Sequence, residues 1–141
     1  MNKNIIIAGV ILMSLLSLGG CSAQEDFTFL LEANVEGTTI NMKATMTYVG
    51  SLEEIAIFSS DPIAGFRITD EKGNVVYDAM AVRLISQKRR LRSNESITTM
   101  NKAENMNLEP GVYTVITLFS YSRKEQDEDT VVKREMEIMI Q

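Results

Sequence analysis

The sequence predicts an all-β fold: an antiparallel β-sandwich of about seven to eight strands that follows a cleaved N-terminal signal helix. Three observations support this prediction. Short stretches of alternating polar and apolar residues recur between turn signals, most clearly over residues 40–48. After residue 20, no stretch shows the periodicity of an amphipathic helix, and the long uncharged apolar run lies at the N-terminus. A small closed barrel is the alternative architecture.

The N-terminal run has the form of an export signal. Lys3 provides a short positive region, and residues 5–18 follow without a charged side chain. A membrane-spanning helix needs about 20 apolar residues, and this run ends at two glycines with no basic flank. We therefore expect residues 1–20 to be removed.

The residues Leu18-Gly19-Gly20-Cys21 end this run and include the single cysteine of the chain. They resemble the lipobox of bacterial lipoproteins. The resemblance implies cleavage between Gly20 and Cys21, a diacylglyceryl thioether on Cys21, and a lipid anchor on the extracytoplasmic face of the cell membrane, or of an outer membrane if the source has one. A plain secretory signal is the alternative, but the chain has no second cysteine to pair with Cys21.

Composition limits what the mature chain can do. Lys3 is the only charged residue of the signal, so residues 21–141 carry 13 basic and 19 acidic groups, a formal charge of −6. This acidic balance argues against nucleic acid as a partner. The chain has no histidine, and lipidation would use its one thiol, which excludes histidine-dependent triads, cysteine nucleophiles and Cys/His zinc sites. We expect neither an enzyme nor a cofactor or metal site.

One domain is expected over residues 27–141, preceded by a lipidated N-terminus and short polar tether over residues 21–26. The cluster Ser59-Ser60-Asp61-Pro62 predicts a turn between two strands. Asp70-Glu71-Lys72-Gly73-Asn74 predicts a hairpin turn with Gly73 at positive φ. Candidate strand segments lie at residues 27–34, 40–48, 55–58, 66–69, 75–77, 82–85, 97–100, 112–121 and 130–140.

The stretch Leu108-Glu109-Pro110-Gly111-Val112-Tyr113 is the most specific fold signal. Its spacing resembles the tyrosine corner of Greek-key sandwiches, in which the phenol bonds to upstream backbone. The sandwich is therefore expected to be of immunoglobulin-like type. Apart from Ser120, residues 112–121 are apolar or Thr on both faces, as in a central strand. Met42, Met46 and Met136 fall on predicted core faces.

Lys88, Arg89, Arg90 and Arg92 form the densest group of positive charge. In an extended strand Lys88, Arg90 and Arg92 would share one face. On a membrane-anchored domain this face could contact lipid headgroups or an anionic polymer. The other interpretation is a charged edge strand that discourages sheet-to-sheet aggregation, and we prefer it because such residues are mostly solvated.

Two groups of acidic residues are candidate sites. Glu125, Asp127, Glu128 and Asp129 could hold calcium but lack the glycine and spacing of an EF-hand loop, so a solvated hairpin tip is the better interpretation. Carboxylate pairs can act as acid and base, but no spacing selects a pair among the three aspartates near turns. These three are Asp61, Asp70 and Asp78.

From about residue 38 to 121 the order of features resembles the BsuPI domain, a bacterial intracellular proteinase inhibitor. The matching pieces are the hairpin over residues 66–77, the segment 91–96 and the stretch 108–115. Gly65, Ser93-Asn94 and the absence of tryptophan depart from the family pattern. The resemblance implies the sandwich fold and a proteinase as partner. We therefore expect a non-enzymatic extracytoplasmic module that binds or assembles with an envelope protein, with a membrane-displayed proteinase inhibitor as the alternative.

Overall fold

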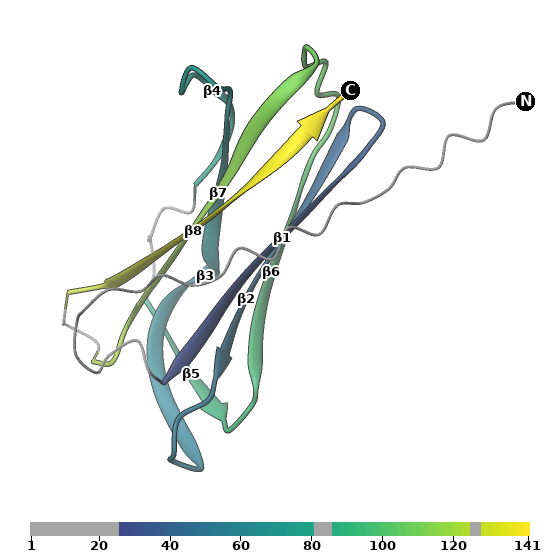
Figure 1. The fold of residues 1–141 in the computed structure, drawn as a ribbon. Helices are drawn as coiled ribbons and strands as arrows, with labels where there is room; N and C mark the ends of the chain where they lie inside the picture. Colours follow the sequence, from purple (N-terminus) through teal and green to yellow (C-terminus); the bar gives the residue numbers. More distant parts are fainter. Residues whose placement is uncertain (1–25, 81–85, 125–127) are drawn as a thin grey trace, which may run out of the picture.

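The computed structural model describes residues 26–80, 86–124 and 128–141, and these form eight antiparallel strands in two sheets (Figure 1). The first sheet has the order β1-β2-β6, and the second has the order β4-β3-β7-β8 with β5 also paired to β3. Within these ranges no helix is long and apolar enough to cross a membrane. The strands are β1 (Phe27–Glu36), β2 (Thr39–Tyr48), β3 (Glu54–Thr69), β4 (Val75–Ala79), β5 (Gln87–Arg92), β6 (Ser96–Ala103), β7 (Gly111–Ser122) and β8 (Thr130–Ile140).

This strand order confirms the predicted antiparallel, immunoglobulin-like sandwich. Strands β1, β2 and β6 take the places of A, B and E in such folds, and β3, β7 and β8 take those of C, F and G. The phenol of Tyr113, at the start of β7, donates a hydrogen bond to the carbonyl oxygen of Glu109 at 2.8 Å. The predicted tyrosine corner is therefore present, and it fixes the chain where it enters the second sheet.

The core lies between the sheets and follows the alternation along β2. Ile40, Met42, Ala44, Met46 and Tyr48 are all buried, and their burial removes apolar surface from water.

Aromatic rings close one end of this core. The ring of Phe27 lies 5.2 Å from that of Tyr121, and the ring of Phe29 lies 5.0 Å from that of Phe119. Arg134, on the inward face of β8, covers the ring of Phe29 at 5.6 Å. Met136 on the same strand packs against the core, as predicted.

Strand β3 corrects one prediction. The residues from Ser59 to Pro62 do not form a turn between two strands, because β3 continues through them as one strand of 16 residues. Its pairing with β7 shifts register between Ser59 and Ala64. A bulge of this kind accommodates a proline, which cannot donate a ladder hydrogen bond, without ending the strand. As a result β5 and β4 pair with successive parts of β3.

Apart from β3, the ends of the expected strands in the described residues lie within three residues of those observed, and β5 is an additional strand. Strand β1 runs two residues past the expected Asn34, and the turn to β2 is made by Gly37 and Thr38. Gly37 has a φ of 63° and Gly73 a φ of 83°, both in the region that favours glycine. The expected strand at residues 82–85 lies outside the described residues.

Candidate functional site

The basic cluster lies on β5, which pairs only with β3 among the described strands and is therefore an edge strand. Side chains alternate along it, so Lys88, Arg90 and Arg92 point to solvent on one face, as expected from the sequence. Leu91 is buried on the other face. The charges on the outward face suit both interpretations of the cluster.

Arg89 does not share this outward face. Its guanidinium Nη2 lies 3.2 Å from Asp61 Oδ1 and donates a hydrogen bond to the carbonyl oxygen of Ser60 at 3.2 Å. Its side chain is only 22% exposed. Arg89 therefore ties β5 to the bulge of β3, and three of the four basic residues remain available to a ligand.

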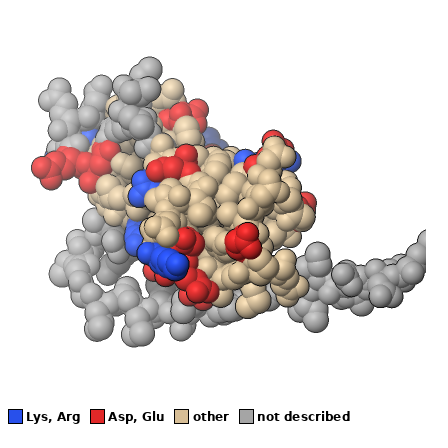
Figure 2. Space-filling model, turned by 90° about the horizontal axis from the view of Figure 1, so that it is seen from above, with Lys and Arg blue, Asp and Glu red and all other residues tan. Residues whose placement is uncertain are grey.

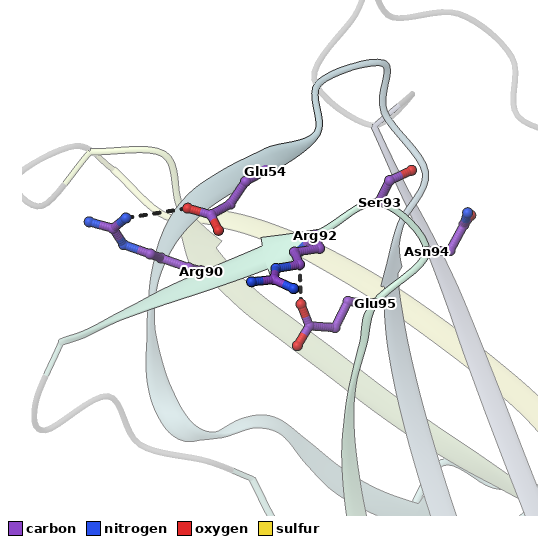
Figure 3. A pocket seen from close by; sticks show the side chains of 6 residues that line it. All are labelled: Glu54, Arg90, Arg92, Ser93, Asn94 and Glu95. Carbon is purple, nitrogen blue, oxygen red and sulfur yellow. Dashed lines mark hydrogen bonds and ion pairs between the residues drawn. The ribbon is translucent and has the colours of Figure 1, made fainter.

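At the end of β5 an open hollow of about 580 Å³ lies over the corner between β5 and β6 (Figure 3). Within it Arg90 Nη1 contacts Glu54 Oε1 at 3.3 Å. The Glu95 carboxylate turns back to accept a hydrogen bond from the backbone N–H of Arg92 at 2.8 Å. The lining residues are Glu54, Arg90, Arg92, Ser93, Asn94 and Glu95.

The corner itself is held by backbone hydrogen bonds to other segments. Asn94, at a φ of 64°, donates its N–H to the carbonyl of Tyr48 at 2.7 Å. Ser93 donates to the carbonyl of Glu53 at 3.0 Å, and Tyr48 donates to the carbonyl of Glu95 at 3.0 Å. The hollow is thus part of a fixed junction between β2, β3 and β6.

The chemistry of the hollow is that of a polar contact surface. Two guanidinium groups and two carboxylates face water there, together with a hydroxyl and an amide. Arg90 is 68% exposed on its side chain, and exposed ion pairs of this kind contribute about 0–1 kcal/mol. The arrangement suits reversible hydrogen bonding to a polar or charged partner.

Glu54 and Glu95 are the charged residues of this hollow that the sequence did not predict as site residues. Glu54 is 36 residues from Arg90, and the two meet because Glu54 pairs with Arg92 in the β3–β5 register. Glu95 lies three residues from Arg92, and the segment 91–96 was singled out only through the family resemblance. The sequence signal for Glu54 and Glu95 was the presence of opposite charges near turns. Such charges do not predict which residues of two strands lie opposite each other.

The three aspartates near turns contact different partners and do not come together in a pair. Asp61 contacts Arg89, and Asp78 contacts Arg67 at 3.0 Å. Asp70 accepts hydrogen bonds from Asn74 Nδ2 and the Asn74 backbone N–H, both at 2.8 Å. The Asn74 amide, followed by this N–H, holds the pKa of the Asp70 carboxyl below its ordinary value. Each carboxylate stabilises its own turn or strand pair.

The acidic run is only partly described. Glu125 and Asp127 lie outside the described residues, as do Gly20 and Cys21. Asp129 accepts a hydrogen bond from the hydroxyl of Ser120 at 2.7 Å. The described ranges contain no group of three acidic, cysteine or histidine residues placed to hold a metal.

Two buried hydroxyl groups face the interior without a hydrogen-bond partner in the described part of the chain. They belong to Ser59 and Tyr121, which oppose each other in the β3–β7 register. Burial raises the pKa of the Tyr121 phenol above its ordinary value, and the charge of Arg123 offsets part of this effect. Tyr121 therefore serves as a packing residue whose hydroxyl makes no hydrogen bond to the described residues.

Comparison with known proteins yields structural likenesses at low sequence identity. No protein-family model matches the chain, and neither does any curated protein. A protein from Archaeoglobus fulgidus is 16% identical, with a TM-score of 0.48, and the match covers 83% of this chain and 97% of that one. β-Glucosidase 3B from Thermotoga neapolitana is 14% identical with a TM-score of 0.35, over 81% of this chain and 17% of the enzyme.

A β-glucosidase from Kluyveromyces marxianus, solved with glucose, is likewise 14% identical, with a TM-score of 0.37 over 80% of this chain and 15% of that one. The chain thus spans about a sixth of the length of these enzymes. At such scores the likenesses carry no conclusion about activity.

Proposed function

We propose that the protein is a lipid-anchored, non-enzymatic module on the extracytoplasmic face of the cell membrane, where its sandwich binds or assembles with another envelope component. One observation carries the proposal. The residues Leu18-Gly19-Gly20-Cys21 end an uncharged apolar run, and β1 begins six residues after Cys21. The spacing supports an anchor placed directly before a folded domain.

The chemistry of the domain supports a binding role. The mature chain has no histidine and, once lipidated, no free thiol, so its polar side chains suit hydrogen bonding and ion pairing. In the corner hollow, Arg90 and Arg92 lie beside Glu54 and Glu95 and are open to solvent. Such a surface suits a polar or charged segment of a partner protein. The fixed junction beneath it would keep these groups in place during binding.

The anchor is tested by metabolic labelling with a fatty acid in cells that express wild-type protein, Cys21→Ser and the matched control Ser22→Ala. Wild type and Ser22→Ala should incorporate label and lose residues 1–20. Cys21→Ser should remain as unlabelled precursor. Label retained in Cys21→Ser would overturn the anchor.

The binding role is tested by cross-linking and pull-down from intact membranes with the wild-type protein and an Arg90→Ala/Arg92→Ala variant. A specific envelope protein that is captured less by the variant supports the proposal. In a second experiment, the wild-type form of this protein is titrated against a panel of serine proteases. Stoichiometric inhibition would replace the assembly role with that of a membrane-displayed proteinase inhibitor, which the resemblance to the BsuPI domain implies.

A further inference from the structure

The loop that joins β2 to β3, residues 49–53, exposes two apolar side chains close together in sequence. Val49 is 43% exposed and Leu52 is 60% exposed, with only Gly50 and Ser51 between them. A single exposed apolar residue needs no special explanation. Here two such residues share one short loop at the end of the sandwich with the exposed polar residues Ser51 and Glu53.

The structure holds this loop in one conformation. The backbone N–H of Leu52 donates to the phenol oxygen of Tyr48 at 3.1 Å, so the loop wraps over the tyrosine ring. That ring in turn packs against Phe27, with centroids 5.6 Å apart. A Cβ atom at Gly50 would lie 2.5 Å from Tyr48 Cε2, so only glycine permits this close approach. A loop fixed in this way loses little conformational entropy when its tip binds a surface.

The loop lies beside the start of the domain. The N–H of Val49 donates to the carbonyl of Asp26 at 2.8 Å. Asp26 follows Cys21 by five residues, which span at most about 18 Å. Strand β1 has ten residues and is about 33 Å long, so an upright domain could not bring its opposite end to a bilayer that holds Cys21.

Charge at the loop end is neutralised only in part, because Glu53 inside the loop is exposed and suits the headgroup region rather than the acyl chains. Asp26 is paired with Arg123 at 3.3 Å, and Glu54 is paired with Arg90. The opposite end, which faces the viewer in Figure 2, carries acidic and basic side chains dispersed among uncharged ones. Its exposed carboxylates include Glu36, Glu71, Glu104 and Glu109.

We propose that the 49–53 loop enters the headgroup region of the bilayer, with Val49 and Leu52 as its apolar contacts. This inference rests on the lipid attachment proposed above. The anchor supplies the membrane affinity, and the loop sets the orientation, since apolar side chains at an interface lie about 5–10 Å into the boundary between headgroups and acyl chains. The opposite end of the sandwich then points away from the membrane, and the corner hollow beside the loop lies near the headgroups, so a partner that uses it must also lie at the membrane surface.

The full-length precursor is expressed, and its lipidated mature form is purified and reconstituted in vesicles of phosphatidylethanolamine and phosphatidylglycerol. Because lipidation blocks Cys21, an introduced cysteine is the only free thiol and accepts a nitroxide label. The variants are Leu52→Cys, Ser51→Cys in the same loop, and Val75→Cys as the matched control, whose apolar side chain is 52% exposed at the opposite end. Electron paramagnetic resonance then compares relaxation by oxygen, which concentrates in lipid, with relaxation by an aqueous nickel chelate.

On the Leu52→Cys and Ser51→Cys variants, the oxygen-to-nickel ratio should be several-fold higher than on Val75→Cys. Equal ratios on a protein whose Cys21 is shown by mass spectrometry to be lipidated would overturn the loop insertion and leave the anchor intact. Absence of lipid on Cys21 would overturn the proposed anchor and, with it, this orientation. The Ser51→Cys variant retains Leu52, so the loss of that side chain cannot produce a false negative.

Discussion

The two ends of the sandwich are closed in different ways. At the end with the β3–β4 turn, two short motifs contribute local contacts: Asp70 bonds to Asn74, and Tyr113 bonds to Glu109, each four residues away. Long-range hydrogen bonds from Met106 to Thr38 and from Val112 to Glu71 add to them. At the end where β1 begins, distant segments are joined, as in the contact between Arg123 and Asp26, 97 residues apart. Contacts between neighbouring residues are encoded by short motifs, whereas contacts between distant segments depend on the whole fold.

The largest expected effect is on the free energy of unfolding, when a glycine at each end of the sandwich is replaced by alanine. Gly50→Ala would place a Cβ against the Tyr48 ring, and overpacking of this kind costs about 1–3 kcal/mol of unfolding free energy. Gly73→Ala meets open space, so its cost comes only from the positive φ and is about 1–2 kcal/mol. Urea unfolding of both variants measures the difference.

In addition, Gly50→Ala should speed amide exchange at Leu52, because the loop can no longer close over the phenol. Gly73→Ala should leave that exchange unchanged. If Gly50→Ala matched the wild type in stability and in exchange, the fixed loop at the β1 end would be refuted.

Next in size are the buried phenols. Tyr48→Phe and Tyr113→Phe each remove one hydrogen bond and leave a backbone partner unsatisfied, at a cost of about 1–2 kcal/mol. Tyr121→Phe removes a hydroxyl that has no partner in the described part of the chain, so it should be neutral or stabilising. Thermal unfolding of the three variants checks this ranking of their stabilities. A destabilised Tyr121→Phe would contradict it.

A pH dependence follows from the turn at Asp70. Hydrogen bonds from Asn74 lower the pKa of this carboxyl in the folded state. A lowered folded pKa means that the stabilisation is full above the unfolded pKa, about 4, and is lost as the pH falls through the folded value. Asp70→Asn should therefore be less stable than wild type at pH 7, and the difference should shrink below about pH 4. Urea unfolding across this range tests it, and a constant difference would count against the assignment.

The smallest effect is expected in the corner hollow. Glu54→Gln removes the charge partner of Arg90 from an exposed pair, which typically costs about 0.2–1 kcal/mol. A double-mutant cycle with Arg90→Gln isolates the coupling, which should decrease in high salt. A coupling well above this range would mean that the hollow is more rigid and less hydrated than its exposure implies.

Much of the fold follows from local patterns. The alternation of residues 40–48 and the stretch from Leu108 to Tyr113 predicted β2 and the tyrosine corner, because each depends on neighbouring residues. The continuous β3 was not predicted, since Ser59 to Pro62 are turn-forming residues that the sheet accommodates as a bulge. Burial by neighbouring strands outweighed the local preference there.

The candidate site was predictable only in part. The outward face shared by Lys88, Arg90 and Arg92 follows from strand alternation, whereas the inward turn of Arg89 toward Asp61 depends on the β3–β5 pairing. The loop with Val49 and Leu52 gave no sequence signal of its own. Its position beside Asp26 arises from a backbone hydrogen bond between segments that are 23 residues apart.

Intact-mass analysis of the protein extracted from membranes tests the central proposal most directly. We expect a chain that begins at Cys21 and carries a thioether-linked diacylglyceryl group, with residues 1–20 absent. A chain that retains the N-terminal run, or one with a free Cys21 thiol, would contradict the lipid anchor and the orientation derived from it.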